Sequence, residues 1–182
     1  QGLPDNQLVH QVLKGNHDAF RVIVERYQGP LLGYVLSLIN KQPDAEDIIQ
    51  EVFMQAFRKL ETLRDGKVLG NWLYTLARNT TFNCLKQRGK KIAPGTPELM
   101  NTNFHQTTEP DEIKVKEDMK KLIAHTVNNL SEEYRVVISL KHYHNHSCQE
   151  IAIILGEPVG TVTSKLSRAY QLLRNELVNQ SE

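Results

Sequence analysis

Cysteine is scarce in this chain of 182 residues, and long hydrophobic runs are missing. The two cysteines, Cys84 and Cys148, lie far apart within helical patterns, which argues against a disulfide scaffold and against a four-ligand zinc site. A reducing, cytoplasmic setting is therefore expected. No apolar stretch approaches the roughly 20 residues that a membrane span requires, and no signal peptide is visible at the start.

An excess of charge of either sign is also lacking. Lysine and arginine together number 22 against 21 acidic residues, so the formal net charge is +1. A uniformly basic coat is excluded, and any binding to nucleic acid must come from local segregation of charge. No nucleophile–base pair, phosphate-binding loop or pair of acid/base carboxylates stands out. We therefore expect a protein that is not an enzyme and that needs no cofactor and no metal.

Alternation of apolar and polar residues with a period of two is absent beyond a few residues, so strands are not expected. Helical periodicity fills residues 1–91 and resumes in residues 117–182. Between them, residues 92–116 combine proline, glycine, asparagine and threonine with few apolar side chains and several acids, which is typical of a flexible linker. The predicted fold class is all-α, with two small helical domains joined by a flexible acidic linker.

The stretch 147–173 has the pattern of two short helices joined by a tight turn. Ser147 and Glu150 form a capping box at the first helix, and Gly156 supplies the left-handed residue at its end. The second helix is expected to begin at Thr161, beyond a proline that prevents the first from continuing. This pattern predicts a helix-turn-helix, which lays its second helix in the DNA major groove.

Residues 44–60 form the clearest amphipathic helix, and its first turn carries acidic residues, as the helix dipole favours. An apolar stripe should face the core, while the opposite side carries mainly Asp47, Gln50, Glu51, Met54 and Arg58. Two interpretations of that side stay open. It is either an ordinary solvated acidic face or a docking surface for a basic partner helix, to which Met54 adds adaptable apolar contact.

Shortly after this helix the charge reverses, and aromatic side chains alternate with lysines and arginines. Single-stranded nucleic acid requires such a surface, because cations hold its phosphates while rings stack on unpaired bases. The glycine-bounded loop 64–70 is a candidate rim for a pocket that receives an extruded base. The alternative is that Trp72 and Phe82 belong to the hydrophobic core.

Three alternating histidines, His142, His144 and His146, suggest a metal site, and the outer two would share a helical face. No carboxylate or thiol is obviously placed to complete such a site, which argues against a metal. A metal-dependent enzyme that uses the three histidines is the alternative on this point. Another alternative is a stand-alone transcription regulator that binds duplex operators through the helix-turn-helix. A regulator of that kind does not need the basic and aromatic helix 71–88.

Three motifs, in this order, resemble the extracytoplasmic-function (ECF) sigma factors of the sigma-70 family: PDAEDIIQEVFMQAFRKL, NWLYTLARNTTFNCLKQR and EIAIILGEPVGTVTSKLSRAYQLL. The resemblance covers nearly the whole chain apart from the linker. It implies that the first domain binds the β′ clamp helices of bacterial RNA polymerase core and opens the −10 promoter element. It further implies that the second domain reads the −35 element and contacts the β flap, and that an anti-sigma factor is a partner.

The resemblance also assigns residues by matching position. For polymerase binding these are Asp44, Glu46, Asp47, Gln50, Glu51 and Met54. For −10 DNA they are Arg64, Lys67, Trp72, Tyr74, Arg78, Asn79, Phe82, Asn83 and Lys86. For −35 DNA they are Thr161, Thr163, Ser164, Lys165, Ser167 and Arg168. Thr163 and Tyr170 stand where the family often has a basic residue, which predicts weaker contact with phosphates.

Overall fold

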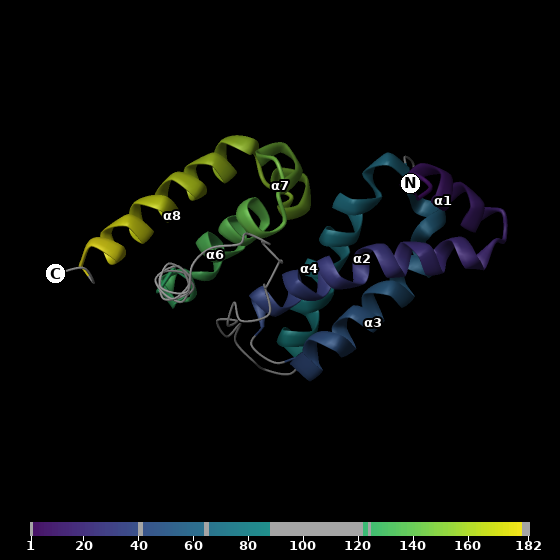
Figure 1. Ribbon diagram of the computed structural model, residues 1–182, viewed down its shortest axis with the longest axis horizontal. Coiled ribbons are helices and arrows are strands. Elements are labelled where there is room, and N and C mark those ends of the chain that lie inside the picture. The colour runs from purple at the N-terminus through teal and green to yellow at the C-terminus, as the bar shows by residue number, and fades with distance from the viewer. Residues whose placement is uncertain (1, 40–41, 64–65, 88–121, 124, 180–182) are drawn as a thin grey trace, which may run out of the picture.

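The computed structural model describes residues 2–39, 42–63, 66–87, 122–123 and 125–179; the predicted linker lies outside these residues. The described part contains helices and no strand, which confirms the all-α prediction (Figure 1). Before the linker come α1 (Asp5–Leu13), α2 (His17–Leu38), α3 (Gln42–Lys59), η1 (Leu60–Thr62), η2 (Gly66–Val68) and α4 (Leu69–Gln87). After it, residues 122–123 and 125–129 are helical and precede α6 (Glu132–Ile138), the π-helical η4 (Ser139–Tyr143), α7 (Cys148–Leu155) and α8 (Val159–Asn179).

Helices α2, α3 and α4 pack against one another, and α1 covers α2 and η2. The predicted apolar stripe of α3 lies inside this packing and is at most 8% exposed: Ala45, Ile48, Ile49, Val52, Phe53, Ala56 and, just beyond the helix, Leu60. Burial of such a stripe contributes about 25 cal/mol for each Å² of apolar surface removed from water. The amphipathic pattern therefore fixes which side of α3 faces solvent.

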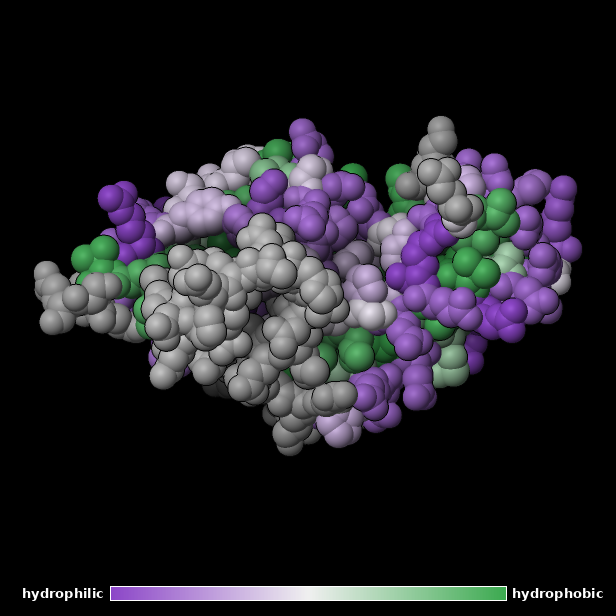
Figure 2. Space-filling view, in the orientation of Figure 1, coloured by the Kyte–Doolittle hydropathy of each residue, from purple (hydrophilic) through white to green (hydrophobic). Residues whose placement is uncertain are grey.

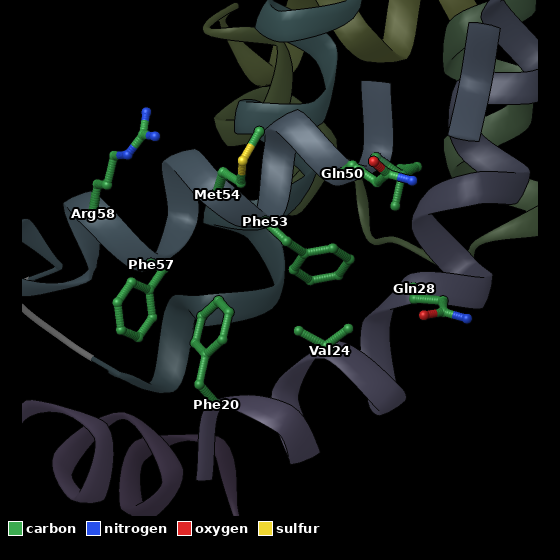
Figure 3. A pocket seen from close by; sticks show the side chains of 9 residues that line it. Phe20, Val24, Gln28, Gln50, Phe53, Met54, Phe57 and Arg58 are labelled. Atoms are coloured by element: carbon green, nitrogen blue, oxygen red, sulfur yellow. The ribbon is translucent and has the colours of Figure 1, made fainter. Parts of the chain in front are cut away.

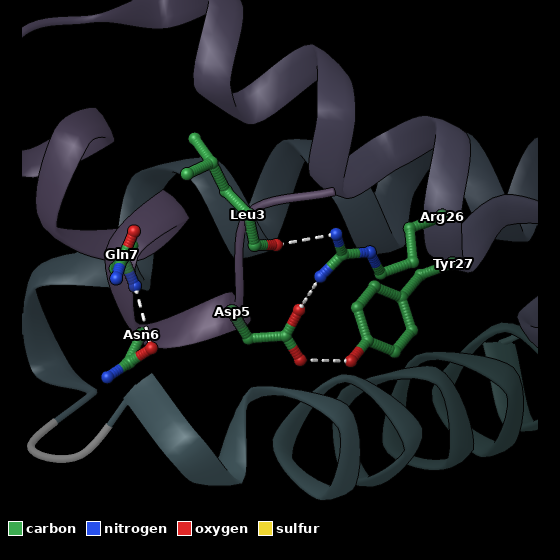
Figure 4. Close-up of polar contacts among 6 residues, drawn as sticks. All are labelled: Leu3, Asp5, Asn6, Gln7, Arg26 and Tyr27. Carbon is green, nitrogen blue, oxygen red and sulfur yellow. Dashed lines mark hydrogen bonds and ion pairs between the residues drawn. The ribbon is translucent and has the colours of Figure 1, made fainter. Parts of the chain in front are cut away.

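Helix α1 is held by a polar cluster at its first residue, which Figure 4 shows in detail. The carboxylate of Asp5 accepts hydrogen bonds from the guanidinium of Arg26 and from the hydroxyl of Tyr27, both on α2. Arg26 also donates to the backbone carbonyl of Leu3 at 2.7 Å. Partial burial, together with the hydrogen bond to Asp5, raises the pKa of Tyr27, so its hydroxyl keeps its proton and donates.

Helix α2 runs without interruption through Pro30. Proline in a helix interior removes one backbone hydrogen bond and costs about 3 kcal/mol. Ile23 before it and Leu31 after it are both fully buried in the same core. The helix therefore continues because tertiary packing on both sides of the proline outweighs its local cost.

The helix-turn-helix is formed by α7, the turn that follows it and α8. Ser147 accepts from the amide of Glu150 at 3.2 Å and donates its own amide to that carboxylate at 2.7 Å, which confirms the capping box. Gly156 has φ +67°, in the left-handed region that glycine tolerates. Helix α8 begins at Val159, earlier than expected, directly after Pro158, whose carbonyl accepts from the backbone amides of Thr161 and Val162. The first backbone N–H groups of a helix have no partner within it, so a residue without one fits at this position.

The two helical groups touch each other. Helix α7 packs against α4, while α6 and η4 pack against α2, and the buried residues of both groups form one continuous core. Helix α8 extends away from α1–α4, with the C-terminal end at its far tip (Figure 1). The visible surface of the described residues is mostly hydrophilic, with smaller hydrophobic patches (Figure 2). No helix of the described residues has the length and apolar character to cross a membrane.

Candidate functional site

The outer side of α3 carries the six residues predicted to bind polymerase, which we call the α3 docking face: Asp44, Glu46, Asp47, Gln50, Glu51 and Met54. None of them is buried. Glu46, Asp47, Gln50 and Met54 are exposed, whereas Glu51 is half-buried and accepts a hydrogen bond from the Gln55 side-chain amide at 2.7 Å. This side of α3 therefore presents carboxylates and a thioether to solvent, as the amphipathic pattern predicts.

An apolar groove of about 600 Å³ lies between α2 and α3, beside the docking face (Figure 3). Gln50 and Met54 of the docking face line one wall, and Phe20 and Val24 of α2 line the other. Its other lining residues are Gln28, Ile49, Phe53, Phe57 and Arg58. The sequence does not predict the α2 wall, because Phe20 and Val24 have the helical spacing of ordinary core residues. Only the pairing of α2 with α3 leaves their side chains partly exposed to solvent.

Phe57 is an exposed aromatic residue of this groove, with 43% of its surface open to solvent. Its ring lies 5.0 Å from that of Phe20 in an edge-to-face arrangement and 5.6 Å from that of His17. Such pairs stabilise this arrangement of rings by about 0.5–1.5 kcal/mol each. The groove is therefore preformed and apolar, and its rim carries the charged side chain of Arg58.

The residues predicted to contact −10 DNA that the structure describes lie on α4, and we call them the α4 surface: Trp72, Tyr74, Arg78, Asn79, Phe82, Asn83 and Lys86. Asn79, Asn83 and Lys86 are exposed, and Arg78 lies over the Phe82 ring at 4.9 Å from its centroid. This cation–π pair presents charge and ring together. Arg64 and the side chain of Lys67, the predicted loop contacts, lie outside the described residues.

Two aromatic residues of the α4 surface are partly or wholly withdrawn from solvent. Trp72 is half-buried and packs against the core. It is therefore partly a core residue, as the alternative interpretation has it, and partly open to solvent, as a residue of a nucleic-acid surface would be. Tyr74 is only 5% exposed, and its hydroxyl lies 3.0 Å from Nδ1 of His144 in the second helical group. Burial raises the pKa of Tyr74, so the hydroxyl remains protonated in this contact.

The outward side of α8 carries the six residues predicted to read −35 DNA, which we call the recognition face: Thr161, Thr163, Ser164, Lys165, Ser167 and Arg168. All are exposed except Lys165. Its ammonium lies 2.8 Å from one carboxylate oxygen of Glu157 and 3.7 Å from the carboxylate of Glu133. Thr163 donates its hydroxyl to the backbone carbonyl of Gly160 at 2.9 Å, so that hydroxyl is also engaged within the helix.

The three histidines face different partners. Nε2 of His142 lies 2.7 Å from the hydroxyl of Tyr170, and His144 contacts Tyr74, whereas Nδ1 of His146 lies 4.0 Å from the carboxylate of Glu150. The outer two therefore do not share a helical face, because η4 ends before His144. Among the described residues, His, Cys, Asp and Glu side chains form no group of three or more that could hold a metal ion.

The fold and these surfaces define an all-helical DNA-binding protein with a helix-turn-helix in its second part. Family profiles agree: sigma-70 region 2 matches residues 23–91 and sigma-70 region 4 matches residues 120–173. The ECF RNA polymerase sigma-E factor of Escherichia coli strain K12 is 31% identical over 182 residues, covering 96% of this chain and 95% of that protein. The sigma-E factor of Haemophilus influenzae is 29% identical over 184 residues, covering 96% of each.

Solved structures have the same fold. CnrH, in complex with the cytosolic domain of CnrY, is similar with a TM-score of 0.70 and 21% identity, covering 98% of this chain and 99% of that one. The sigma factor RpoE of Bartonella quintana, in complex with the anti-sigma factor NepR, gives 0.65 and 24%, covering 87% and 96%. The chain belongs to the sigma-70 family, as an ECF RNA polymerase sigma factor, and members of this family are not enzymes.

Proposed function

We propose that this sigma factor divides initiation among three of its surfaces. The α3 docking face holds the β′ clamp helices of RNA polymerase, the α4 surface captures the opened −10 element, and the recognition face of α8 reads the −35 element. In this scheme residues 1–91 and 117–182 are the two working domains, the second of which also leans on the β flap. In the same scheme residues 92–116 connect these two domains.

One observation carries the proposal. Helix α3 turns its whole apolar stripe into the core, yet leaves Asp47, Gln50 and Met54 in solvent beside a preformed apolar groove. A purely solvated face has no use for such a groove, whereas a partner helix binds by seating apolar side chains while its basic residues meet carboxylates. The combination favours docking over the solvated interpretation.

The α4 surface supports the second step. Cations and rings on one helix suit unpaired bases, and the Arg78–Phe82 pair offers both in one place. No energy source is needed, because bases that leave the stack are captured by the protein and the duplex equilibrium shifts toward the open form. Stacking of about 1–3 kcal/mol per base is comparable to the cost of unpairing a flexible step.

The partners follow from this assignment. The proposal places the protein in the cytoplasm, where it meets bacterial RNA polymerase core and promoter DNA. It also includes an anti-sigma factor as a regulator, since the two related structures named above were solved with CnrY and with the anti-sigma factor NepR. In this scheme polymerase and the regulator compete for the groove beside the docking face of the first domain.

A charge reversal tests the docking face. Asp47→Lys changes an exposed carboxylate of that face, whereas Glu61→Lys makes the same change on η1, away from it. Like charges across an interface cost several kcal/mol, so Asp47→Lys should weaken the affinity for core polymerase at least about tenfold. Glu61→Lys should leave it unchanged. Equal affinity of the two variants, measured by fluorescence anisotropy of labelled protein, would remove α3 from the interface.

A further inference from the structure

We infer that this sigma factor is autoinhibited by its own second domain, which closes over α4 and withdraws Tyr74 from promoter DNA. The inference rests on the proposed role of α4 and adds a form of regulation to it. The contact is made by residues of α2, α4 and the segment before α7, which we call the interdomain cluster: Tyr34, Tyr74, His144 and His146.

The cluster joins the two domains through rings and one hydrogen bond. Tyr34 is fully buried, with its ring 5.3 Å from that of Tyr74 and 5.8 Å from that of His144. The rings of Tyr74 and His146 are 4.5 Å apart in an edge-to-face arrangement. The hydroxyl of Tyr74 lies 3.0 Å from Nδ1 of His144. Tyr74 is thus enclosed on the side that the second domain covers.

A second contact lies one turn along α2. The hydroxyl of Ser139 donates to that of Ser37, with 3.0 Å between the two oxygens. Gly33 directly precedes Tyr34, and a Cβ atom there would be 3.7 Å from Cε1 of His144. Two points of close approach, each joining α2 to the segment 139–144, define one docked position rather than a loose association of the domains.

The interdomain contact includes buried polar atoms that weaken it. Three buried polar atoms of the cluster, the Tyr34 hydroxyl and Nε2 of His144 and His146, find no hydrogen-bond partner among the described residues. Each such atom loses hydration without compensation, so the closed arrangement is less stable than its apolar contacts alone would make it. Opening returns these atoms to water. Binding to polymerase or to DNA then draws the chain into the open form.

Closure has a direct consequence for the α4 surface. Tyr74 is the residue of that surface with the least exposure, and its hydroxyl is already used by His144. An unpaired base cannot stack on a ring that Tyr34, His144 and His146 surround. The chain must therefore open before the full α4 surface is available, and the population of open molecules limits initiation.

A reversible crosslink tests the inference. In a background with Cys84→Ser and Cys148→Ser, the pair Ser37→Cys and Ser139→Cys places two thiols where hydroxyls now lie 3.0 Å apart. Mild oxidation should join them, as seen by mobility on a non-reducing gel. The oxidised protein should direct initiation by core polymerase at least about tenfold more slowly, since a locked chain leaves almost no open population. Reductant should restore the rate.

The outcomes separate the inference from the proposed function. If the thiols do not join, the closed arrangement is overturned, and if they join without slowing initiation, autoinhibition is overturned. If the reduced protein and its cysteine-free parent both fail to direct initiation, the proposed function is wrong. In that case the crosslink still tests whether the closed arrangement forms. Binding of a single-stranded oligonucleotide to the oxidised and reduced forms then tests whether closure covers α4.

A matched pair of histidine variants gives a second test without a crosslink. His144→Ala removes the partner of Tyr74, whereas His142→Ala removes a histidine two residues earlier that contacts Tyr170 of α8 instead. Loss of one hydrogen bond should shift the equilibrium toward the open form by about fivefold. With labels on the two domains, energy transfer should fall for His144→Ala and stay constant for His142→Ala. Equal values for both variants would contradict the inference.

Discussion

Two cations on the recognition face illustrate why residue type alone does not decide a role. Lys165 and Arg168 are three residues apart on α8 and both point outward by helical spacing. Lys165 is nevertheless held by Glu157 and Glu133, which fastens α8 to the turn and to α6. Arg168 is exposed. We therefore expect Arg168 to contribute more to DNA affinity than Lys165, although the sequence treats them alike.

Arg168→Ala should weaken binding of the polymerase holoenzyme to a −35 element. A contact with a base edge is worth about 1–3 kcal/mol and depends on that base, whereas loss of a phosphate contact lowers the salt slope by about 0.9 for any sequence. Titrations over a range of salt concentrations distinguish the two cases. Arg174→Ala, an exposed arginine further along α8, is the control and should leave affinity and slope unchanged.

The burial of Tyr74 cannot be predicted from its neighbours in the sequence. Its neighbours along α4 assign it to the nucleic-acid surface, and nothing in the sequence connects it with a histidine 70 positions away. That pairing follows from how α7 packs on α4, which depends on the shapes of both surfaces. Local patterns therefore predict which residues carry suitable chemistry, whereas tertiary packing decides which of them solvent can reach.

At the scale of elements, the sequence predicts most of what the structure contains. The capping box at Ser147, the left-handed Gly156 and the buried stripe of α3 are local signals, and the structure confirms each of them. The two prolines are harder. Pro30 lies inside α2, whereas Pro158 directly precedes α8. The same residue type gives both results because tertiary packing holds α2 together around Pro30, while the start of α8 has unpaired backbone N–H groups and tolerates a proline. Sequence alone does not report that packing.

Glycine substitutions test the attachment of α1. A Cβ atom at Gly66 in η2 would lie 2.7 Å from the Cα atom of Asn6, a backbone atom that cannot rotate away. Gly66→Ala should therefore push α1 outward and lower the free energy of unfolding by about 1–3 kcal/mol. Gly29 in α2 has no atom within 4 Å of such a Cβ, so Gly29→Ala should be neutral or stabilising by up to about 1 kcal/mol.

Urea denaturation of both glycine variants provides the measurement. Equal stability of the two proteins would mean that α1 yields freely around Gly66, and that the bonds of Asp5 to Arg26 and Tyr27 do not fix its position. A loss of stability confined to Gly66→Ala would instead establish that α1 and η2 are packed as one unit. The slope against urea concentration should not change, since neither variant alters the surface exposed on unfolding.

At the scale of the whole molecule, a net charge of +1 conceals strong local segregation. Carboxylates collect on the outer side of α3, while cations collect along α4 and α8. One chain can therefore bind a protein with one surface and nucleic acid with two others, without a field that attracts either of them everywhere. The interdomain cluster adds a constraint at this scale, because it controls whether the two groups of helices act as one body.

The interdomain cluster predicts a pH dependence of stability. Burial, with a smaller contribution from the nearby His146, lowers the pKa of His144 from its ordinary 6.5 to about 4. In the unfolded chain the imidazole takes up a proton near its ordinary pKa, so between these two values the unfolded state binds more protons. The free energy of unfolding should therefore fall as the pH drops from about 6.5 to about 4, by about 1–3 kcal/mol for this partly buried group.

His144→Gln should flatten this decline, since glutamine has no proton to gain. The groups that face His144 are Tyr34 of α2, Tyr74 of α4 and His146, and the tyrosines stay protonated throughout this range because burial raises their pKa values. The pKa of Glu150, in the capping box, is lowered below its ordinary 4.5, so its contribution is lost only at more acidic pH. Urea denaturation between pH 7.5 and 5 therefore isolates the histidines, and a decline of equal steepness in both proteins would exclude His144 as its source.

Because His144 joins two domains, the same acidification should lower energy transfer between them before the chain unfolds. A loss of stability without such opening would mean that a group other than His144 takes up the proton.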